Sequence, residues 1–112
     1  MDRAVFVFSD DLAVFPSLAS AEGGTEVFDL SESRYLDEEG TVISAAADGY
    51  RVRLTLTTER RSEELRERLH IYLERSGLNP GLADDPSAAA RVLMERQRLA
   101  RWPRWLHRLR HR

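Results

Sequence analysis

Histidine and carboxylate residues at helical spacing are the first candidates for chemistry in this sequence. His107 and His111 are four residues apart, as a helical pair of metal ligands would be, but the arginines around them would repel a cation. His70 and Glu74 have the same spacing, and we interpret that histidine as a residue at the edge of an apolar helix face that makes an ordinary hydrogen bond. We therefore predict no metal site and no bound cofactor.

Adjacent carboxylates are the remaining candidates for acid–base catalysis. Asp10-Asp11 and Glu38-Glu39 are neighbours in sequence, and neighbouring side chains point to different sides of the chain, so both pairs are expected to be solvated charges in turns. The absence of cysteine removes thiolate nucleophiles and thiolate metal sites. Gly23-Gly24 lacks the spacing of a phosphate-binding loop. The chain is therefore expected not to be an enzyme, and no residue is assigned a catalytic role.

The formal net charge of −2 conceals a strong gradient along the chain. Residues 1–50 contain eleven acidic residues and two arginines, whereas residues 86–112 contain eight arginines and one glutamate. Such an asymmetry predicts charged partners at one end or at both. The alternative is that the two ends attract each other within the fold.

Length and composition fit one soluble domain. The chain has 112 residues, of which 42% are hydrophobic, and a chain of this size can bury one core without disulfide or metal support. The first residues carry an acid at Asp2 and only a short apolar run, unlike a signal peptide. No stretch approaches the roughly 20 apolar residues of a membrane span. We therefore expect a cytoplasmic protein.

The first sixty residues indicate short strands separated by turns. Residues 4–8 consist of one alanine followed by alternating Val and Phe, which favours a buried strand, and residues 12–15 are expected to form the returning strand of a hairpin. Ser17 can cap a short helix over residues 18–22, which the two glycines end. Further strands are expected at residues 25–30, 33–37, 41–44 and 50–57, with a break over residues 45–49.

The segment 50–57 alternates apolar and polar residues with a period of two, the pattern of a half-buried strand. The alternation directs one set of side chains toward the core, namely Tyr50, Val52, Leu54 and Leu56. It directs the other set toward water or a partner, namely Arg51, Arg53, Thr55 and Thr57.

Two helices are expected after residue 60, where the apolar period lengthens to that of a helix. Ser62 is a good N-cap, and Gly77 is a suitable stop. The apolar stripe between them consists of Leu65, Leu69, Tyr72 and Leu73. Asp85 and Pro86 then start a second helix that Pro103 breaks. Its broad apolar face, with Arg96 near the middle, consists of Ala89, Val92, Leu93, Leu99 and Ala100.

These elements predict an α+β fold in a single domain over residues 1–112. An antiparallel meander packed by one helix is expected to form the core over residues 1–77. Residues 78–85 are expected to form a loop that could act as a hinge. Residues 86–112 are expected to form an appended C-terminal helix with a basic, Arg/Trp-rich tail.

Two segments are candidate binding surfaces. One is an acidic face interleaved with aromatic residues, suited to a basic protein partner: Glu26, Asp29, Glu32, Tyr35, Asp37, Glu38 and Glu39. The other is the basic tail, suited to nucleic acid or an anionic membrane surface: Arg101, Trp102, Arg104, Trp105 and Arg108. Alternatively, the acidic face is merely solvated, and the tail packs back onto its own domain or onto a second copy in a homodimer.

The layout of residues 5–76 resembles that of small bacterial immunity-type proteins, which are encoded beside secreted polymorphic toxins. The segments that carry the resemblance are VFVF at 5–8, SLASAEGGTEVFDL at 17–30, SRYLDEEGTVIS at 33–44 and YRVRLTLT at 50–57, followed by a Leu-rich helix. The resemblance implies a protein that neutralises a cognate toxin domain by binding and occluding it. It assigns no binding residue, and the Arg/Trp tail has no counterpart in the pattern.

Overall fold

The computed structural model describes residues 3–24 and 32–100. The strand expected at residues 25–30 and the whole basic tail therefore lie outside the described residues. The described helices and strands are β1 (Val5–Phe8), β2 (Leu12–Phe15), α1 (Leu18–Gly24), β3 (Arg34–Asp37), β4 (Thr41–Asp48), β5 (Arg51–Arg60), α2 (Ser62–Arg75), the 3-10 helix η2 (Pro80–Asp84) and α3 (Pro86–Ala100).

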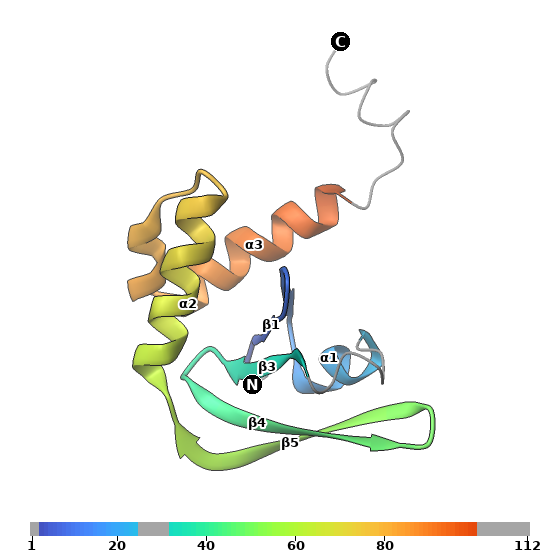
Figure 1. The fold of residues 1–112 in the computed structure, drawn as a ribbon. Coiled ribbons are helices and arrows are strands. Elements are labelled where there is room, and N and C mark those ends of the chain that lie inside the picture. Colours follow the sequence, from blue (N-terminus) through green and yellow to red (C-terminus); the bar gives the residue numbers. More distant parts are fainter. Residues whose placement is uncertain (1–2, 25–31, 101–112) are drawn as a thin grey trace.

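The strands form an antiparallel sheet in the order β2-β1-β3-β4-β5, which confirms the α+β class (Figure 1). The order from β3 to β5 is a meander, but β1 lies between β2 and β3. Its sequence explains this central position, because every residue of VFVF is buried and a strand with two apolar faces needs cover on both.

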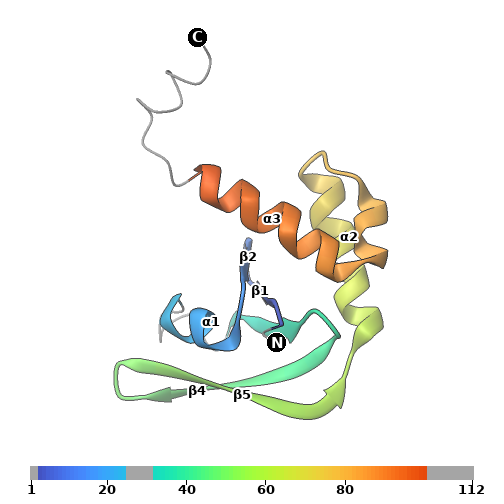
Figure 2. The same ribbon diagram turned by 180° about the vertical axis from the view of Figure 1, so that it is seen from behind.

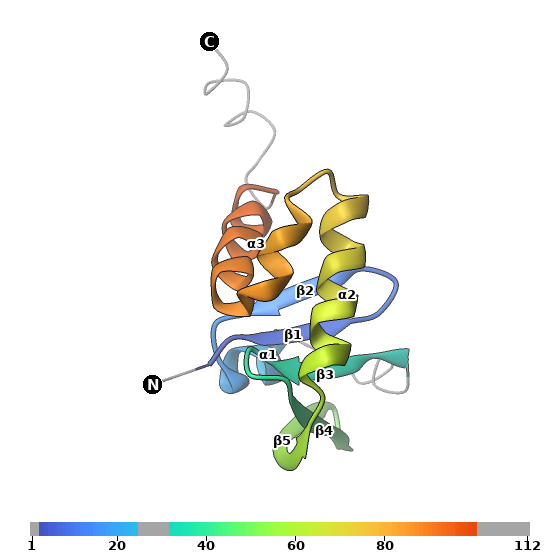
Figure 3. The ribbon, with the colours of Figure 1, turned by 90° about the vertical axis from the view of Figure 1, so that its left-hand side faces the viewer.

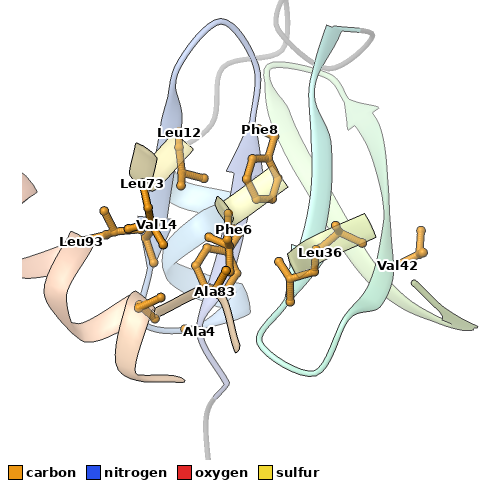
Figure 4. Close-up of a cluster of buried hydrophobic side chains, with 14 residues drawn as sticks. Ala4, Phe6, Phe8, Leu12, Val14, Leu36, Val42, Leu73, Ala83 and Leu93 are labelled. Carbon is orange, nitrogen blue, oxygen red and sulfur yellow. The ribbon is translucent and has the colours of Figure 1, made fainter. Parts of the chain in front are cut away.

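Each face of the sheet has its own buried cluster. Phe6, Phe8 and Leu36 pack against the leucines of α2 and against α3 (Figure 4). On the opposite face, Val7, Tyr35, Ile43, Val52 and Leu54 pack with Ala21 of α1. The short helix α1 contacts both β2 and β5, so the sheet curves around it, as Figures 1 and 2 show from opposite sides.

The expected leucine stripe of α2 is confirmed: Leu65, Leu69 and Leu73 are fully buried, and Tyr72 is partly buried. The expected Ser62 cap is wrong. Ser62 is the first helical residue, Arg61 precedes it without a side-chain capping bond, and the Ser62 hydroxyl donates to the Glu39 carbonyl oxygen at 3.3 Å.

Residues 78–100, expected to form a hinge and an appended helix, are packed onto the core. Pro80–Asp84 forms η2 where a loop was expected, and Ala83 within it is buried. In α3, Ala89, Ala90 and Leu93 belong to the same buried cluster as Phe6, whereas Val92 is exposed. Figure 3 shows α3 lying alongside η2 and α2. Small alanines allow α3 to approach the sheet closely, and this makes it part of the core.

The break expected at residues 45–49 is also wrong, because β4 continues to Asp48. The turn is Gly49-Tyr50, and Gly49 has a φ of +64°. A positive φ at the first turn residue only is the pattern of a type II′ hairpin turn. The β4–β5 hairpin is longer than the four-residue strands β1, β2 and β3, and it runs along the lower edge of Figure 1.

An ion cluster ties α2 to the sheet. Arg34 of β3 donates through Nε and Nη2 to the two carboxylate oxygens of Glu64, at 2.8 and 3.2 Å. Arg68 donates to Glu64 at 3.0 Å and lies over the Phe8 ring, 5.5 Å from its centroid. The hydrogen bond from Arg34 holds the pKa of Glu64 below its ordinary value and raises the pKa of Arg34.

We predict that Glu64→Gln lowers the free energy of unfolding at pH 7 by about 1 kcal/mol. Because the folded pKa of Glu64 is lowered, the stabilisation is complete above the ordinary value of 4.5 and is lost as the pH falls through the folded pKa. Urea denaturation across this range should show the two proteins converging in acid. A constant difference between them at every pH would contradict the prediction.

Candidate binding surface

Two residues of the acidic face expected from the sequence, Tyr35 and Asp37, are buried in the fold. Asp37 is 1% exposed, and its Oδ1 accepts the backbone N–H groups of Glu39 at 2.9 Å and Thr41 at 2.8 Å. Its other oxygen lies 3.7 Å from Nη1 of Arg3. Tyr35 is 2% exposed and belongs to the buried cluster under α1. The assignment of Tyr35 and Asp37 to a binding surface is therefore wrong, since neither can reach a partner.

The glutamates of the same turn are joined to neighbouring elements. Glu39 pairs with Arg3 and with Arg60, both at 3.2 Å. Glu38 accepts a hydrogen bond from the Ser87 hydroxyl at the start of α3, at 3.1 Å. Glu32 is exposed at the surface. Glu26, Asp29 and the five tail residues Arg101, Trp102, Arg104, Trp105 and Arg108 lie outside the described residues.

A different surface, at the end of the β4–β5 hairpin, carries exposed side chains of the types that anchor protein partners. We call residues 48–55 the hairpin tip. Tyr50 is fully exposed, with a relative exposure of 103%, and Arg51 and Arg53 beside it are exposed. Asp48 pairs with Arg53 at 3.1 Å. Together with Glu22 and Gly23 of α1, the tip borders an open hollow of about 780 Å³.

The expected inward orientation of Tyr50 and Leu56 is wrong, whereas that of Val52 and Leu54 is confirmed. Val52 and Leu54 are buried under α1, but Leu56 is 48% exposed. Alternation gives the face of the sheet to which a side chain points, and α1 covers only part of that face. The available signal for the turn was Gly49, because glycine at the first central position is typical of a type II′ hairpin turn. A turn read from this glycine would have placed Tyr50 at the tip.

On each of the two outer strands of the sheet, a side chain from a neighbouring helix hydrogen-bonds to an outward-facing backbone group. The Glu22 carboxylate accepts the N–H of Leu54 on β5 at 2.8 Å. On β2, the Gln97 side chain accepts the Val14 N–H and donates to the Val14 carbonyl, both at 2.9 Å. Such caps discourage uncontrolled pairing of exposed strand edges.

The described residues offer little for metal or membrane chemistry. Among them, no group of three or more histidine, aspartate or glutamate side chains could hold a metal ion. The Nδ1 atom of His70 lies 3.7 Å from Glu74, and both side chains are exposed. Over the same part of the chain, no helix is long and apolar enough to cross a bilayer.

Comparison with known proteins gives no relative on which a function could be based. The chain matches no protein-family model, no curated protein and no solved structure.

We predict that Asp37→Ala lowers the free energy of unfolding by about 2 to 3 kcal/mol, because two backbone N–H groups lose their acceptor inside the protein. Glu39→Ala, which removes two exposed ion pairs from the same turn, should cost less than about 1 kcal/mol. Urea denaturation of both variants measures the difference. Equal losses would show that the Asp37 carboxylate does not organise the turn.

Proposed function

We propose that this chain is a small non-catalytic protein-binding module, an immunity protein that neutralises a cognate toxin domain by binding and occluding it. The observation that carries the proposal is the fully exposed Tyr50 at the end of an extended hairpin. Tyrosine and arginine are enriched among residues that dominate binding energy at interfaces. An aromatic ring left in water at a hairpin tip contributes nothing to the core, so its use is best explained by a partner.

The charges around Tyr50 support an anchoring role. Among the described residues, Arg51 has no ion-pair partner, while Arg53 is already paired with Asp48. The guanidinium of Arg51 is therefore available for a carboxylate of the partner, with planar two-point hydrogen bonding. A narrow hairpin bearing Tyr50 and Arg51 has a shape suited to entering the cleft of another protein.

The same proposal places the protein in the bacterial cytoplasm, where an immunity protein would meet its toxin. Occlusion requires no catalytic residue, cofactor or metal of its own. It requires a rigid support and a few exposed anchors, and the bond from the Leu54 N–H to the Glu22 carboxylate of α1 gives the hairpin such a support.

A second candidate function is binding of nucleic acid or of an anionic membrane surface through the basic tail. The exposed Arg91 and Arg96 of α3 favour it, because they extend the positive charge of the tail onto the described part of the chain. Binding of duplex DNA or of anionic lipid vesicles would then weaken steeply with salt. Replacing Arg101, Arg104 and Arg108 by Gln should abolish that binding while leaving toxin neutralisation intact.

We predict that Tyr50→Ala combined with Arg51→Ala abolishes protection against the toxin domain encoded beside this gene. Loss of two anchors should weaken the complex by about 2 kcal/mol or more, at least about 30-fold. The measurement is growth of a heterologous bacterium that expresses both proteins, together with calorimetry of the purified pair.

The matched control is Ile71→Ala, which removes an exposed apolar side chain from α2. It should bind and protect as the unaltered protein does. The proposal fails if the double variant retains full affinity, or if the unaltered chain neither binds nor protects.

A further inference from the structure

A groove separate from the hairpin tip lies between β2, α1 and α3. Its volume is about 550 Å³. Figures 1 and 2 show, from opposite sides, that α1 and the C-terminal half of α3 lie on the same side of the molecule. The residues that line the groove are Val14, Phe15 and Pro16 from β2 and the segment after it, Ser20, Gly23 and Gly24 from α1, and Met94, Gln97 and Arg98 from α3.

Phe15 and Met94 form the large apolar part of the groove lining, and its polar side chains are those of Ser20, Gln97 and Arg98. Phe15 and Met94 are both half-buried and pack against the two core clusters. Gly24 permits the ring of Phe15 to lie against the end of α1, because a Cβ there would be 2.4 Å from that ring. Gln97 exchanges two hydrogen bonds with the Val14 backbone. The groove therefore suits an apolar, flat group better than a charged one.

The chain itself has such groups close to this groove in sequence. Met94, Gln97 and Arg98 are in the last two turns of α3, and Trp102 follows Ala100 by only two residues. Twelve residues remain after α3, which can span up to about 40 Å. A tryptophan side chain buries about 150–250 Å² and packs well against a methionine sulfur.

We propose that the C-terminal segment 101–112 docks on its own domain, with an indole of Trp102 or Trp105 in the groove against Phe15 and Met94. Pro103 prevents a continuous helix and lets the chain turn back. Attachment to α3 favours docking within one chain, because a tethered segment has an effective concentration in the millimolar range.

The two tryptophans of the protein are both in this segment, so intrinsic fluorescence reports on it alone. In the full chain we expect an emission maximum shifted to the blue of free N-acetyltryptophanamide and a several-fold smaller quenching constant with acrylamide. Ser20→Arg places a long cation in the groove and should shift the emission to the red and increase quenching several-fold. Ala19 precedes Ser20 on the same helix and does not line the groove, so Ala19→Arg should change neither signal.

Three results would overturn the proposal. The first is a water-exposed, fully quenchable emission in the unaltered chain. The second is equal behaviour of Ser20→Arg and Ala19→Arg, which would place the indoles elsewhere. The third is protected emission that disappears on dilution together with a dimeric mass by light scattering, which would assign the groove to the tail of a second copy. Circular dichroism confirms that each variant is folded before fluorescence is compared.

Discussion

The tight turn at residues 37–40 is the constraint on which the rest of the structure depends. The buried Asp37 carboxylate holds the N–H groups of Glu39 and Thr41, and Gly40 adopts a φ of +83°. A Cβ at residue 40 would lie 2.7 Å from the Cα of Ser62, so only glycine lets the start of α2 come this close. Backbone bonds from Glu38 to Ala4 and from Arg61 to Gly40 then join the turn to the N-terminal segment and to the β5–α2 junction.

This turn gives the β4–β5 hairpin a fixed base and leaves its far end exposed. Near the base the Thr57 hydroxyl donates to the Val42 carbonyl at 2.7 Å, and the register between the strands shifts. Farther out, Val52 and Leu54 pack under α1, and the Glu22 carboxylate holds Leu54. Tyr50 and Arg51 are therefore held by a supported strand pair. In the proposed complex, such a support would keep the entropy cost of binding low.

The sequence predicted the elements better than it predicted the surface. Local signals sufficed for the β1–β2 hairpin, for the leucine stripe of α2 and for the start of α3, where Asp85 accepts the Ala88 N–H at 3.2 Å. The assignment of Asp37 to a binding surface is wrong because charge usually indicates exposure, whereas this aspartate is buried. An aspartate that precedes a glycine turn can instead accept backbone N–H groups. The inward orientation expected for Tyr50 is wrong because the period-two alternation does not show how far along the strand α1 covers the sheet.

Hydrogen exchange of the chain with and without the proposed toxin partner tests the central claim most directly. The claim is that the hairpin tip binds the partner, whereas the turn at residues 37–40 supports the fold. Binding should slow exchange at residues 48–56. The amides of Glu39 and Thr41, already bonded to Asp37, should be slow in both states. New protection confined to the acidic turn or to α3, with unchanged exchange at the hairpin tip, would contradict it.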